Sequence, residues 1–371
     1  MIVLSREEDE FGKKLFENLR KYKEGVEQFD FSYNIFPDDE PLVRFSGPPL
    51  YSITKGKIRF PRTSQKVRES VKGNYVVFVN RGASGKDWKP VHEFVNAWAS
   101  AKYLKEEMGA EKVCVIMPNM PFAKQDKYFY DEEGNRVEEA ITVKYIRSVL
   151  KNFSNADLLI SVTPHDFRKT GWIVKDENPE MGWKRNEKNQ IVDSEGRVIL
   201  PEPENWTGFA YAIDVTPKLV EYVFKELENP YVVGADKSVK NVIKEIKEKY
   251  ANIDGTFSEK FRNKYFNEML EVEIKDLPKS LKGLDVVLID DVIITAGTMY
   301  KQIQEIKKRN PKSITCAAVH GEFSYNQQGI SGLDVLRNEG ANVIVTNTIE
   351  TPVSVVDVTP EVAKELYELF K

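Results

Sequence analysis

Short runs of apolar residues alternate with helical patterns along most of the chain. Runs such as Ile2–Leu4 and Val286–Ile289 have the length of strands and are apolar throughout. After the first of them, Phe11, Leu15 and Leu19 recur every four positions, which is the spacing of one helix face. Fully apolar strands separated by helices are typical of parallel sheets covered on both faces. The pattern therefore predicts an α/β fold.

The expected strands form two series, which predicts two domains. The first series ends near Leu158–Val162 and the second begins at Tyr231–Val233. A chain of 371 residues is also longer than one hydrophobic core usually serves. We therefore expect tandem α/β domains at residues 1–205 and 206–371. Two polar stretches, 46–65 and 174–205, break the rhythm, and we interpret both as surface insertions.

Charge and cysteine content narrow the class of protein. A net charge of −4 gives no whole-protein attraction to nucleic acid or acidic membranes, so any anion site must be local. Cys114 and Cys316 both lie in apolar, strand-like runs, which argues against a disulfide framework and fits a reducing compartment. The first residues do not resemble a signal peptide, and no apolar run reaches the roughly 20 residues of a membrane span. We expect a soluble, cytoplasmic protein.

The strongest chemical signal is the segment 286–298. Four apolar residues form an expected strand that stops at Asp290 and Asp291, and a small hydroxyl-rich turn follows. A helix carrying Met299, Ile303 and Ile306 on one face comes next. Ligands of open parallel sheets collect outside the carboxyl ends of the strands, where this sequence places its charges.

The acids and the turn suit opposite ends of a sugar phosphate. The turn can wrap backbone N–H groups and two hydroxyls around a phosphate, with help from the helix N-terminus. It consists of Thr295, Ala296, Gly297 and Thr298. Gly297 also allows close backbone approach. Asp290 and Asp291 suit acceptors for sugar hydroxyls, or a magnesium ion held through waters.

This segment resembles the ribose-binding signature of type I phosphoribosyltransferases. Three residues separate the acid pair from Thr295, which is the spacing of the ribose-phosphate pyrophosphokinases, or PRPP synthetases. Other segments resemble motifs of the pyrophosphokinases in the same order: Phe36–Glu40, Glu69–Gly73, Pro121–Lys127, Val162–His165, Val233–Lys237, Lys260–Arg262, His320–Ser324 and Thr346–Ile349. We interpret His320 as structural even within this resemblance.

The resemblance implies two phosphoribosyltransferase-like domains related by duplication, with the active site between them. The implied reaction moves the β,γ-diphosphate of ATP to the 1-hydroxyl of ribose 5-phosphate with Mg²⁺, giving PRPP and AMP. The implied ATP-binding residues are Phe36, Asp38, Glu40, Lys124, Gln125, Asp126 and His165. The implied ribose-phosphate residues are Asp290, Asp291, Thr295, Ala296, Gly297, Thr298 and Asp236. Lys260 and Arg262 would be catalytic, and His165 and Asp236 would bind the metal. A homo-oligomer is also implied, because residues 36–40 would complete a neighbour's nucleotide site.

The sequence departs from the family around both sites. Ile294 stands where the pyrophosphokinases have a third acid, and Thr163 replaces the Asp of their Asp-Leu-His motif. Lys124 replaces an Arg, which loses the planar fork of the guanidinium. Three alternatives therefore stay open: a larger ribosyl acceptor such as ADP-ribose, a phosphoribosyltransferase that consumes PRPP, and a catalytically inactive regulatory homologue.

Overall fold

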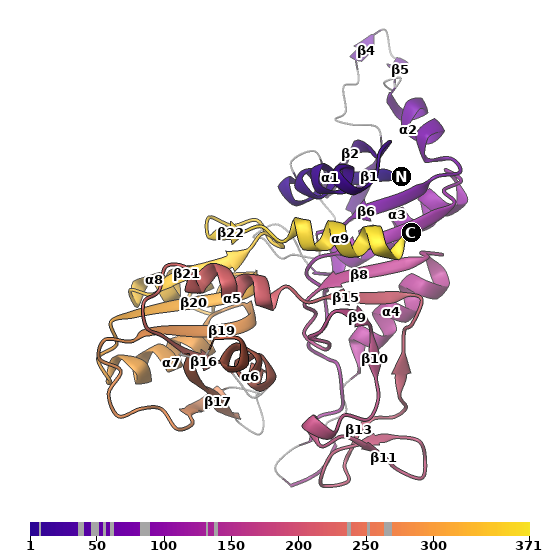
Figure 1. The fold of residues 1–371 in the computed structure, drawn as a ribbon. Helices are drawn as coiled ribbons and strands as arrows, with labels where there is room; N and C mark the ends of the chain where they lie inside the picture. Colours follow the sequence, from indigo (N-terminus) through magenta and orange to yellow (C-terminus); the bar gives the residue numbers. More distant parts are fainter. Residues whose placement is uncertain are drawn as a thin grey trace. The chain divides into compact units, whose positions relative to one another are not determined.

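The structure is a computed structural model. It describes residues 1–6, 9–35, 41–45, 52–54, 57–59, 63–81, 90–130, 133–136, 140–235, 239–250, 253–262 and 269–371. The described residues form two compact units. The first comprises the described residues up to Asp214 together with Thr359–Lys371, and the second comprises Val215–Val358. The C-terminal helix α9 (Thr359–Leu369) therefore belongs to the first unit, where it packs against α1 (Glu10–Tyr22) (Figure 1).

The sheet of the first unit is mainly parallel. In the described residues its strand order is β3-β2-β1-β6-β7-β8-β15-β9, in which only β3 and β9 pair antiparallel. The strands are β1 (Ile2–Arg6), β2 (Glu27–Ile35), β3 (Pro41–Arg44), β6 (Tyr75–Val79), β7 (Lys112–Met117), β8 (Leu158–Val162), β9 (Gly171–Trp172) and β15 (Ala210–Ile213). Besides α1 and α9, the helices are α2 (Thr63–Val71), α3 (Pro90–Glu106) and α4 (Thr142–Phe153). A separate hairpin consists of β4 (Ser52–Thr54) and β5 (Lys57–Arg59).

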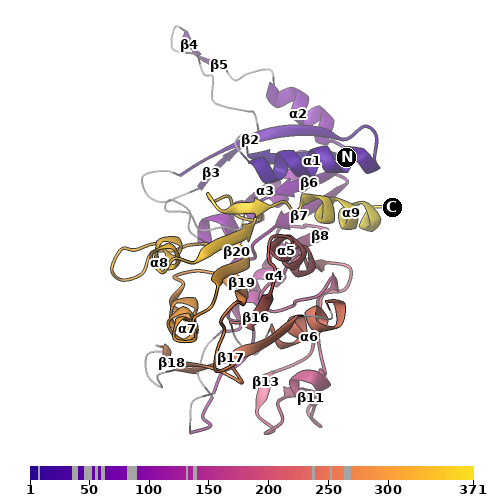
Figure 2. The ribbon, with the colours of Figure 1, turned by 60° about the vertical axis from the view of Figure 1, so that its left-hand side comes forward.

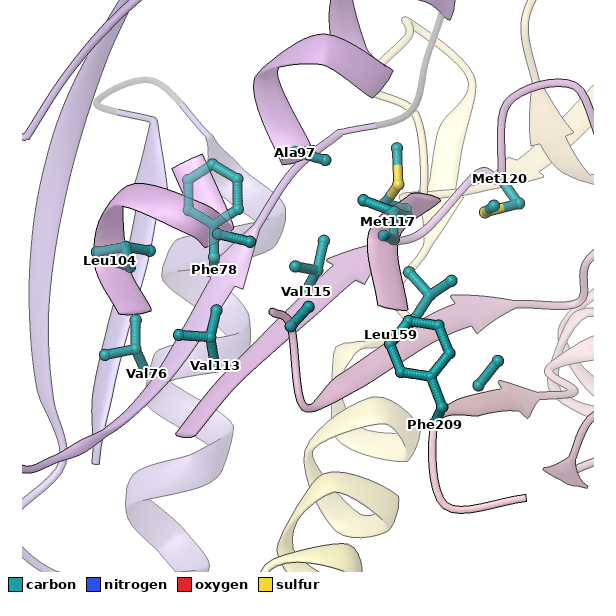
Figure 3. Packing of buried hydrophobic residues seen from close by; sticks show 14 of the residues in the cluster. Val76, Phe78, Ala97, Leu104, Val113, Val115, Met117, Met120, Leu159 and Phe209 are labelled. Carbon is teal, nitrogen blue, oxygen red and sulfur yellow. The ribbon is translucent and has the colours of Figure 1, made fainter. Parts of the chain in front are cut away.

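The core of the first unit lies between its sheet and its helices. Alternate residues of β6 and β7, such as Phe78 and Val115, point to the same face of the sheet because strand side chains alternate. They pack with Ala97 and Leu104 of α3 in one buried cluster (Figure 3). Those two residues lie seven positions apart, which places them on one face of the helix. The apolar strand runs of the sequence thus become buried strands.

The second unit has a seven-stranded sheet in its described residues, with helices on both faces. Its strand order is β18-β17-β16-β19-β20-β21-β22, in which only β17 and β18 pair antiparallel. The strands are β16 (Pro230–Gly234), β17 (Asp254–Arg262), β18 (Met269–Ile274), β19 (Asp285–Ile293), β20 (Ser313–Gly321), β21 (Asn342–Thr346) and β22 (Ser354–Val356). The helices α7 (Gly297–Lys307) and α8 (Gly332–Asn338) cover one face, and α5 (Thr216–Phe224) and α6 (Lys240–Lys249) cover the other (Figure 2). The predicted fold class, two mainly parallel sheets flanked by helices, is confirmed.

Strand order creates a switch point beside the predicted phosphate segment. The neighbours β16 and β19 are parallel, but α6 leads from β16 outward to β17 while α7 leads from β19 to β20 on the other side. Connections that diverge in this way leave a crevice at the carboxyl ends of the two strands, and such crevices bind ligands in open α/β sheets. Residues 294–298 follow the end of β19, and in the sequence Asp236 comes two positions after the end of β16.

The stretch 174–205 is more than a surface insertion. It contains β10 (Val174–Lys175), η1 (Pro179–Met181), β11 (Lys184–Arg185), β12 (Ile191–Val192), β13 (Val198–Leu200) and β14 (Glu204–Asn205). Strands β10 and β14 pair at its base, and β11, β12 and β13 form a small sheet. Ile191 and Leu200 are fully buried in the same cluster as the main sheet. Its apolar runs are only two or three residues long, which explains why the sequence pattern looked polar.

The described helices include none that is both long and apolar enough to cross a membrane. Cys114 and Cys316 are buried free thiols on β7 and β20. Burial raises the pKa of both thiols above that of an exposed cysteine. They are therefore inert core residues, as their apolar surroundings in the sequence suggested.

Candidate functional site

The acid pair lies inside a strand and does not end it. Strand β19 continues to Ile293, and its last residues pair with β20 in the register Asp290 to Ala318 and Val292 to His320. The expectation that the strand stops at the acids is therefore wrong, because the strand continues for two residues after Asp291. The reason is that β20 extends to Gly321 and supplies backbone partners beyond the point where the apolar run of β19 ends.

Asp290 and Asp291 occupy different environments. Successive side chains of a strand point to opposite faces of the sheet, so the two carboxylates are not equivalent. Asp290 is half-buried and its Oδ1 accepts a hydrogen bond of 2.9 Å from the backbone N–H of Asp291. Asp291 is only 4% exposed. Asp290 thus presents a locally oriented carboxylate at the partly open face, while Asp291 lies within the body of the unit.

The predicted phosphate turn leads directly into a helix N-terminus. Ala296 has a left-handed backbone, with φ 61°, and stands at the N-cap of α7. The first turn of α7 is closed by a 2.9 Å bond from the N–H of Tyr300 to the carbonyl oxygen of Ala296. An alanine has no side-chain oxygen with which to cap the helix amides that follow it. The N–H groups at the start of α7 are the kind of donors that helix N-termini offer to phosphates.

The backbone before the turn is held on two sides. The carbonyl oxygen of Ile293 accepts hydrogen bonds from the N–H groups of Glu322 and Phe323, at 3.0 and 3.1 Å. Gly332, the first residue of α8, lies so close that a Cβ there would overlap the carbonyl oxygen of Ile294. Sequence reasoning missed Gly332, because a glycine that starts a helix gives no signal of close approach to a distant loop.

Helix α7 also fixes the end of the neighbouring strand. The buried side chain of Gln302 donates to Ser258 Oγ at 2.6 Å and to the carbonyl oxygen of Ala235 at 3.3 Å. The N–H of Ala235 in turn donates to the carbonyl oxygen of Ile289 at 3.0 Å. Asp236 itself lies outside the described residues, but the residue before it is thus tied to both β19 and α7.

The predicted nucleotide segment lies beyond the carboxyl ends of the parallel strands of the first unit. Lys124 and Gln125 are exposed and Asp126 is buried, in a turn that follows β7. His165 follows β8, which pairs in parallel with β7. The carboxyl ends of parallel neighbours lie at the same edge, so the structure brings His165 to the same edge as residues 124–126. Thr142 Oγ1 donates to Gln125 Oε1 at 2.8 Å and ties that segment to α4.

A buried charged cluster lies beneath this segment. Arg147 donates two hydrogen bonds to Asp166, at 2.6 and 2.8 Å, and Lys175 Nζ lies 2.9 Å from the same carboxylate. Lys175 Nζ also donates to the carbonyl oxygen of Asp126 at 3.0 Å. Burial by itself raises the pKa of Asp166, but Arg147 and Lys175 outweigh it and hold that pKa below the usual value for aspartate. The cluster therefore stays ionised and joins the residue after His165 to the nucleotide segment.

A phosphoribosyl transferase domain model matches residues 236–347, which include the acid pair and the turn. A ribose-phosphate pyrophosphokinase of Sulfurisphaera tokodaii is 28% identical over 70% of this chain and 74% of its own length. One of Methanopyrus kandleri is 25% identical over 100% of this chain and 99% of its own.

The chain resembles the ribose-phosphate pyrophosphokinases along its whole length. A crystal structure of phosphoribosylpyrophosphate synthetase from Mycobacterium smegmatis has the same fold, with a TM-score of 0.63 at 20% identity, covering 100% of this chain and 98% of that one. The identities of 25 to 28% agree with the departures noted at Ile294, Thr163 and Lys124.

Several residues that the family resemblance singled out are only partly described. Phe36, Asp38 and Glu40 lie outside the described residues, as Asp236 does. Lys260 and Arg262 belong to β17, where they pair with Val272 and Met269 of β18, and only their backbone is described. Their roles stay predictions.

His320 is structural, as the sequence suggested. It is buried, and its Nδ1 lies 2.9 Å from Thr348 Oγ1. Thr346 and Thr348 both donate to the carbonyl oxygen of Val319, at 2.7 and 3.0 Å. The family-like motifs 320–324 and 346–349 therefore join β20 to β21.

In the described residues, the equivalent switch point of the first unit carries ion pairs. It lies between β1 and β6, whose helices α1 and α3 lead in opposite directions. Arg6 there donates to both carboxylate oxygens of Glu93, at 2.7 and 2.8 Å, and Arg81 pairs with Asp9 at 2.8 Å. Burial raises the pKa of Glu93 to about 7 against the opposing effect of Arg6. Of the two switch points, the described residues give a phosphate turn to the second alone.

The family implies a magnesium ion, and the donors present suit one. The described residues hold no group of three His, Cys, Asp or Glu side chains that would make a closed metal site. Mg²⁺ seldom needs such a group, because it keeps several waters and binds one or two carboxylates together with substrate phosphates. The half-buried Asp290 carboxylate beside a phosphate turn provides hard oxygen ligands of this kind.

Proposed function

We propose that the protein transfers the β,γ-diphosphate of ATP to the C1 hydroxyl of ribose 5-phosphate, giving PRPP and AMP. The observation that carries the proposal is the turn 294–298, which lies at a topological switch point between an oriented carboxylate and a helix N-terminus. The curated relatives, which are named ribose-phosphate pyrophosphokinases, support the same reaction.

The ribose phosphate would be held in the second unit. The 5-phosphate would accept hydrogen bonds from the amides of residues 295–298 and from the hydroxyls of Thr295 and Thr298. Asp290 and Asp291 would accept hydrogen bonds from the ribose hydroxyls, and Asp236 would help to orient the ribose. The left-handed Ala296 and the close approach of Gly332 support this role, because they fix the backbone before the ligand arrives.

The nucleotide would be held by residues of the first unit. Lys124, Gln125, Asp126 and His165 would bind ATP, and Phe36, Asp38 and Glu40 would complete the site. Lys260 and Arg262 would neutralise charge on the transferring phosphoryl groups. The exposure of Lys124 and Gln125 at the carboxyl edge of the sheet supports the first part of this assignment.

The reaction balances without covalent participation by the protein. The C1 hydroxyl oxygen attacks the β-phosphorus of ATP, the bond from that phosphorus to the bridging oxygen of the α-phosphate breaks, and AMP leaves with that oxygen. The hydroxyl proton passes to solvent. Positioning and electrostatic stabilisation carry the rate in such phosphoryl transfers. His165 and Asp236 would hold Mg²⁺, which would neutralise part of the phosphate charge.

Product analysis tests the proposal. Purified protein is incubated with ATP, Mg²⁺ and ribose 5-phosphate, and nucleotides and sugar phosphates are separated by ion-exchange chromatography. We expect AMP and PRPP in equal amounts. Formation of ADP and a phosphorylated sugar, or of no product, would contradict the proposal.

Ile294 favours a second candidate acceptor. It places a half-buried apolar side chain beside the turn, where the family has a carboxylate. The backbone carbonyl oxygen of Ile294 lies close to Gly332. A ribosyl compound larger than ribose 5-phosphate, such as ADP-ribose, would gain from that apolar wall. Including ADP-ribose in the product analysis separates the two acceptors by their relative kcat/KM.

Two further measurements test the remaining alternatives. Release of pyrophosphate from PRPP in the presence of a nucleobase would identify a phosphoribosyltransferase. Binding of ATP without formation of AMP would identify a regulatory homologue.

We also propose a cytoplasmic location and a homo-oligomer in which residues 36–40 reach a neighbour's nucleotide site. Sedimentation analysis together with complementation between inactive variants of the two sites would test the shared site.

A further inference from the structure

The chain from the predicted nucleotide segment onward, residues 124–130, is hydrogen-bonded at several positions to the stretch 174–205. Lys175 Nζ donates to the carbonyl oxygen of Asp126 at 3.0 Å. Two residues on, the N–H of Tyr128 donates to the carbonyl oxygen of Ile199 at 2.8 Å. Tyr130 Oη then donates to the carbonyl oxygen of Val198 at 2.9 Å. Three alternate residues of the segment are thus bonded to one small substructure.

A side chain between these bonds contacts the same substructure. Lys127 Nζ lies 5.8 Å from the centre of the Trp183 ring, within the range of a cation–π contact. Trp183 is held in turn by a pair of backbone hydrogen bonds with Asn178, at 2.8 and 3.0 Å. Lys127 is one of the cations in the segment that resembles the family's ATP-binding motif, so the insertion also positions a group next to the proposed nucleotide.

Among the residues that make these contacts, Lys175 is buried and has several charged partners. It is 4% exposed, and its ammonium lies 2.9 Å from Asp166 and 3.9 Å from Asp126 Oδ2. A buried ammonium is unfavourable unless charge partners and hydrogen bonds surround it, and losing one partner leaves the others uncompensated. Because Asp166 follows His165 directly, Lys175 joins the loop of His165 to the segment 124–130 through one atom.

We propose that the stretch 174–205 is a brace for the nucleotide site and that Lys175 is its positioning residue. The brace fixes the spacing between the nucleotide segment and the His165 loop, so the affinity for ATP depends on residues that do not touch ATP. The proposal rests on the proposed function, because it takes residues 124–126 and His165 as the nucleotide-binding groups. It adds a second set of residues that determine nucleotide affinity and leave the ribose-phosphate site unchanged.

The first test replaces Lys175 with methionine, which keeps the length of the stem and removes the ammonium. We expect the KM for ATP to rise about tenfold, as loss of a hydrogen bond to a charged group typically causes, while the KM for ribose 5-phosphate stays within about twofold. Hydrogen–deuterium exchange at the amides of residues 126–130 should become faster, because the segment loses its anchor. The matched control is Arg185→Ala, which breaks an exposed ion pair with Asp176 in the same stretch and should change neither KM.

A milder variant keeps the test valid if Lys175→Met does not fold. Tyr130→Phe removes only the bond to Val198 and should raise the KM for ATP about threefold, in line with the modest net value of one neutral hydrogen bond. Equal rises in the KM of both substrates, or faster exchange with no change in the KM for ATP, would overturn the brace.

Failure of the proposed function gives a different result. If the wild-type protein binds ATP in calorimetry but makes no AMP, the function fails, and the brace is then decided by ATP affinity in the two variants. Weaker binding of ATP by Lys175→Met with unchanged binding by Arg185→Ala supports the brace without turnover. A wild-type protein that binds no ATP removes both proposals.

Discussion

At the scale of single residues, the adjacent acids Asp290 and Asp291 differ in their burial and surroundings. Asp290 is half-buried and oriented by a backbone amide, whereas Asp291 is buried. A strand makes this difference unavoidable, because neighbouring side chains point to opposite faces. The sequence predicted the pair as a unit, and the structure separates their environments.

Replacing Asp291 with asparagine should abolish most activity without unfolding the protein. The change keeps the size of the side chain and removes its charge, and loss of one preorganised electrostatic contact typically lowers kcat by about a hundredfold or more. Steady-state formation of AMP measures the effect, and circular dichroism checks the fold. Near-normal turnover in this variant would contradict the assigned role.

The matched control is Asp285→Asn, at the other end of the same strand. Asp285 is also buried, but it bonds to Ser313 Oγ at 2.6 Å and to backbone amides at the amino edge of the sheet. We expect this variant to lose some stability and to keep its KM for ribose 5-phosphate. Loss of activity in both variants would indicate damage to β19 as a whole.

Glu93 should make stability depend on pH. Burial raises its pKa in the folded protein to about 7, from 4.5 for an ordinary glutamate. The unfolded chain therefore releases this proton first, so the contribution of Glu93 is fully present below about pH 4.5 and is lost as the pH rises through 7. Relative to Glu93→Gln, the free energy of unfolding of the wild type should fall by about 3 kcal/mol across that window.

Urea unfolding of both proteins at a series of pH values measures this difference. Between pH 8 and 9 the difference should be constant, which serves as an internal control. A difference that does not vary between pH 4.5 and 7 would show that the Arg6 pair keeps Glu93 ionised throughout.

At the scale of elements, the strand–turn–helix unit 285–307 is the part that the sequence predicted best. The apolar run, the small residues of the turn and the helix spacing of Met299, Ile303 and Ile306 all agree with the structure. The end of β19 was missed because strand length beyond the apolar run is set by β20, which is distant in sequence. For the same reason no sequence pattern pointed to Gly332, whose importance comes from a tertiary contact.

Gly332→Ala should weaken binding of ribose 5-phosphate. The added Cβ would overlap the carbonyl oxygen of Ile294, so the turn must move and the phosphate amides move with it. We expect a loss of about 1–3 kcal/mol of stability, as overpacking typically causes, and at least a fivefold weaker affinity, about 1 kcal/mol of binding free energy. Isothermal titration with ribose 5-phosphate measures it.

Gly255→Ala is the control for that variant. Its Cβ would overlap the carbonyl oxygen of Val232, which is the same kind of clash on β16 and β17. It should destabilise the second unit to a similar extent and leave the affinity for ribose 5-phosphate nearly unchanged. Equal losses of affinity in the two variants would mean that the turn has no special dependence on Gly332.

The insertion 174–205 shows the opposite limit of sequence reasoning. Its polar composition correctly indicated that it interrupts the α/β rhythm, but Lys175 and the short apolar strands gave no hint of burial. Buried lysines are rare in proteins, so a lysine in a polar stretch is read as exposed. The partners that make its burial possible, Arg147 and Asp166, lie on other elements.

At the scale of the whole molecule, the order of the chain and the compact units differ. The sequence placed the boundary near residue 205 and kept the C-terminal helix with the second domain. In the structure the chain passes from one unit to the other between Asp214 and Val215, and Thr359–Lys371 belongs to the first. Helical periodicity predicts that α9 has an apolar face, but it does not say which unit covers that face.

Removing α9 should therefore destabilise the first unit. In a variant that ends at Val358, α1 loses the buried bond from Asn18 Nδ2 to Thr359 Oγ1 and the stacking of Tyr22 on Tyr367. The buried Leu366 is lost as well, and one such side chain is typically worth about 2–5 kcal/mol. We expect faster hydrogen exchange in α1 and a lower midpoint of thermal unfolding. A variant lacking only the exposed Lys371 is the control, and unchanged protection of α1 without α9 would contradict the assignment.

Among the described residues, the two units carry different groups beside their switch points. The first has its strand ends neutralised by the pairs Arg6–Glu93 and Arg81–Asp9, whereas the second has a helix N-terminus and an acid pair there.

The most direct test is a crystal structure of the protein with ribose 5-phosphate. We expect the phosphate at the amides of residues 295–298, within hydrogen-bonding distance of the start of α7, and a ribose hydroxyl within hydrogen-bonding distance of Asp290. A sugar phosphate bound elsewhere, with that turn occupied by protein groups, would contradict the central claim.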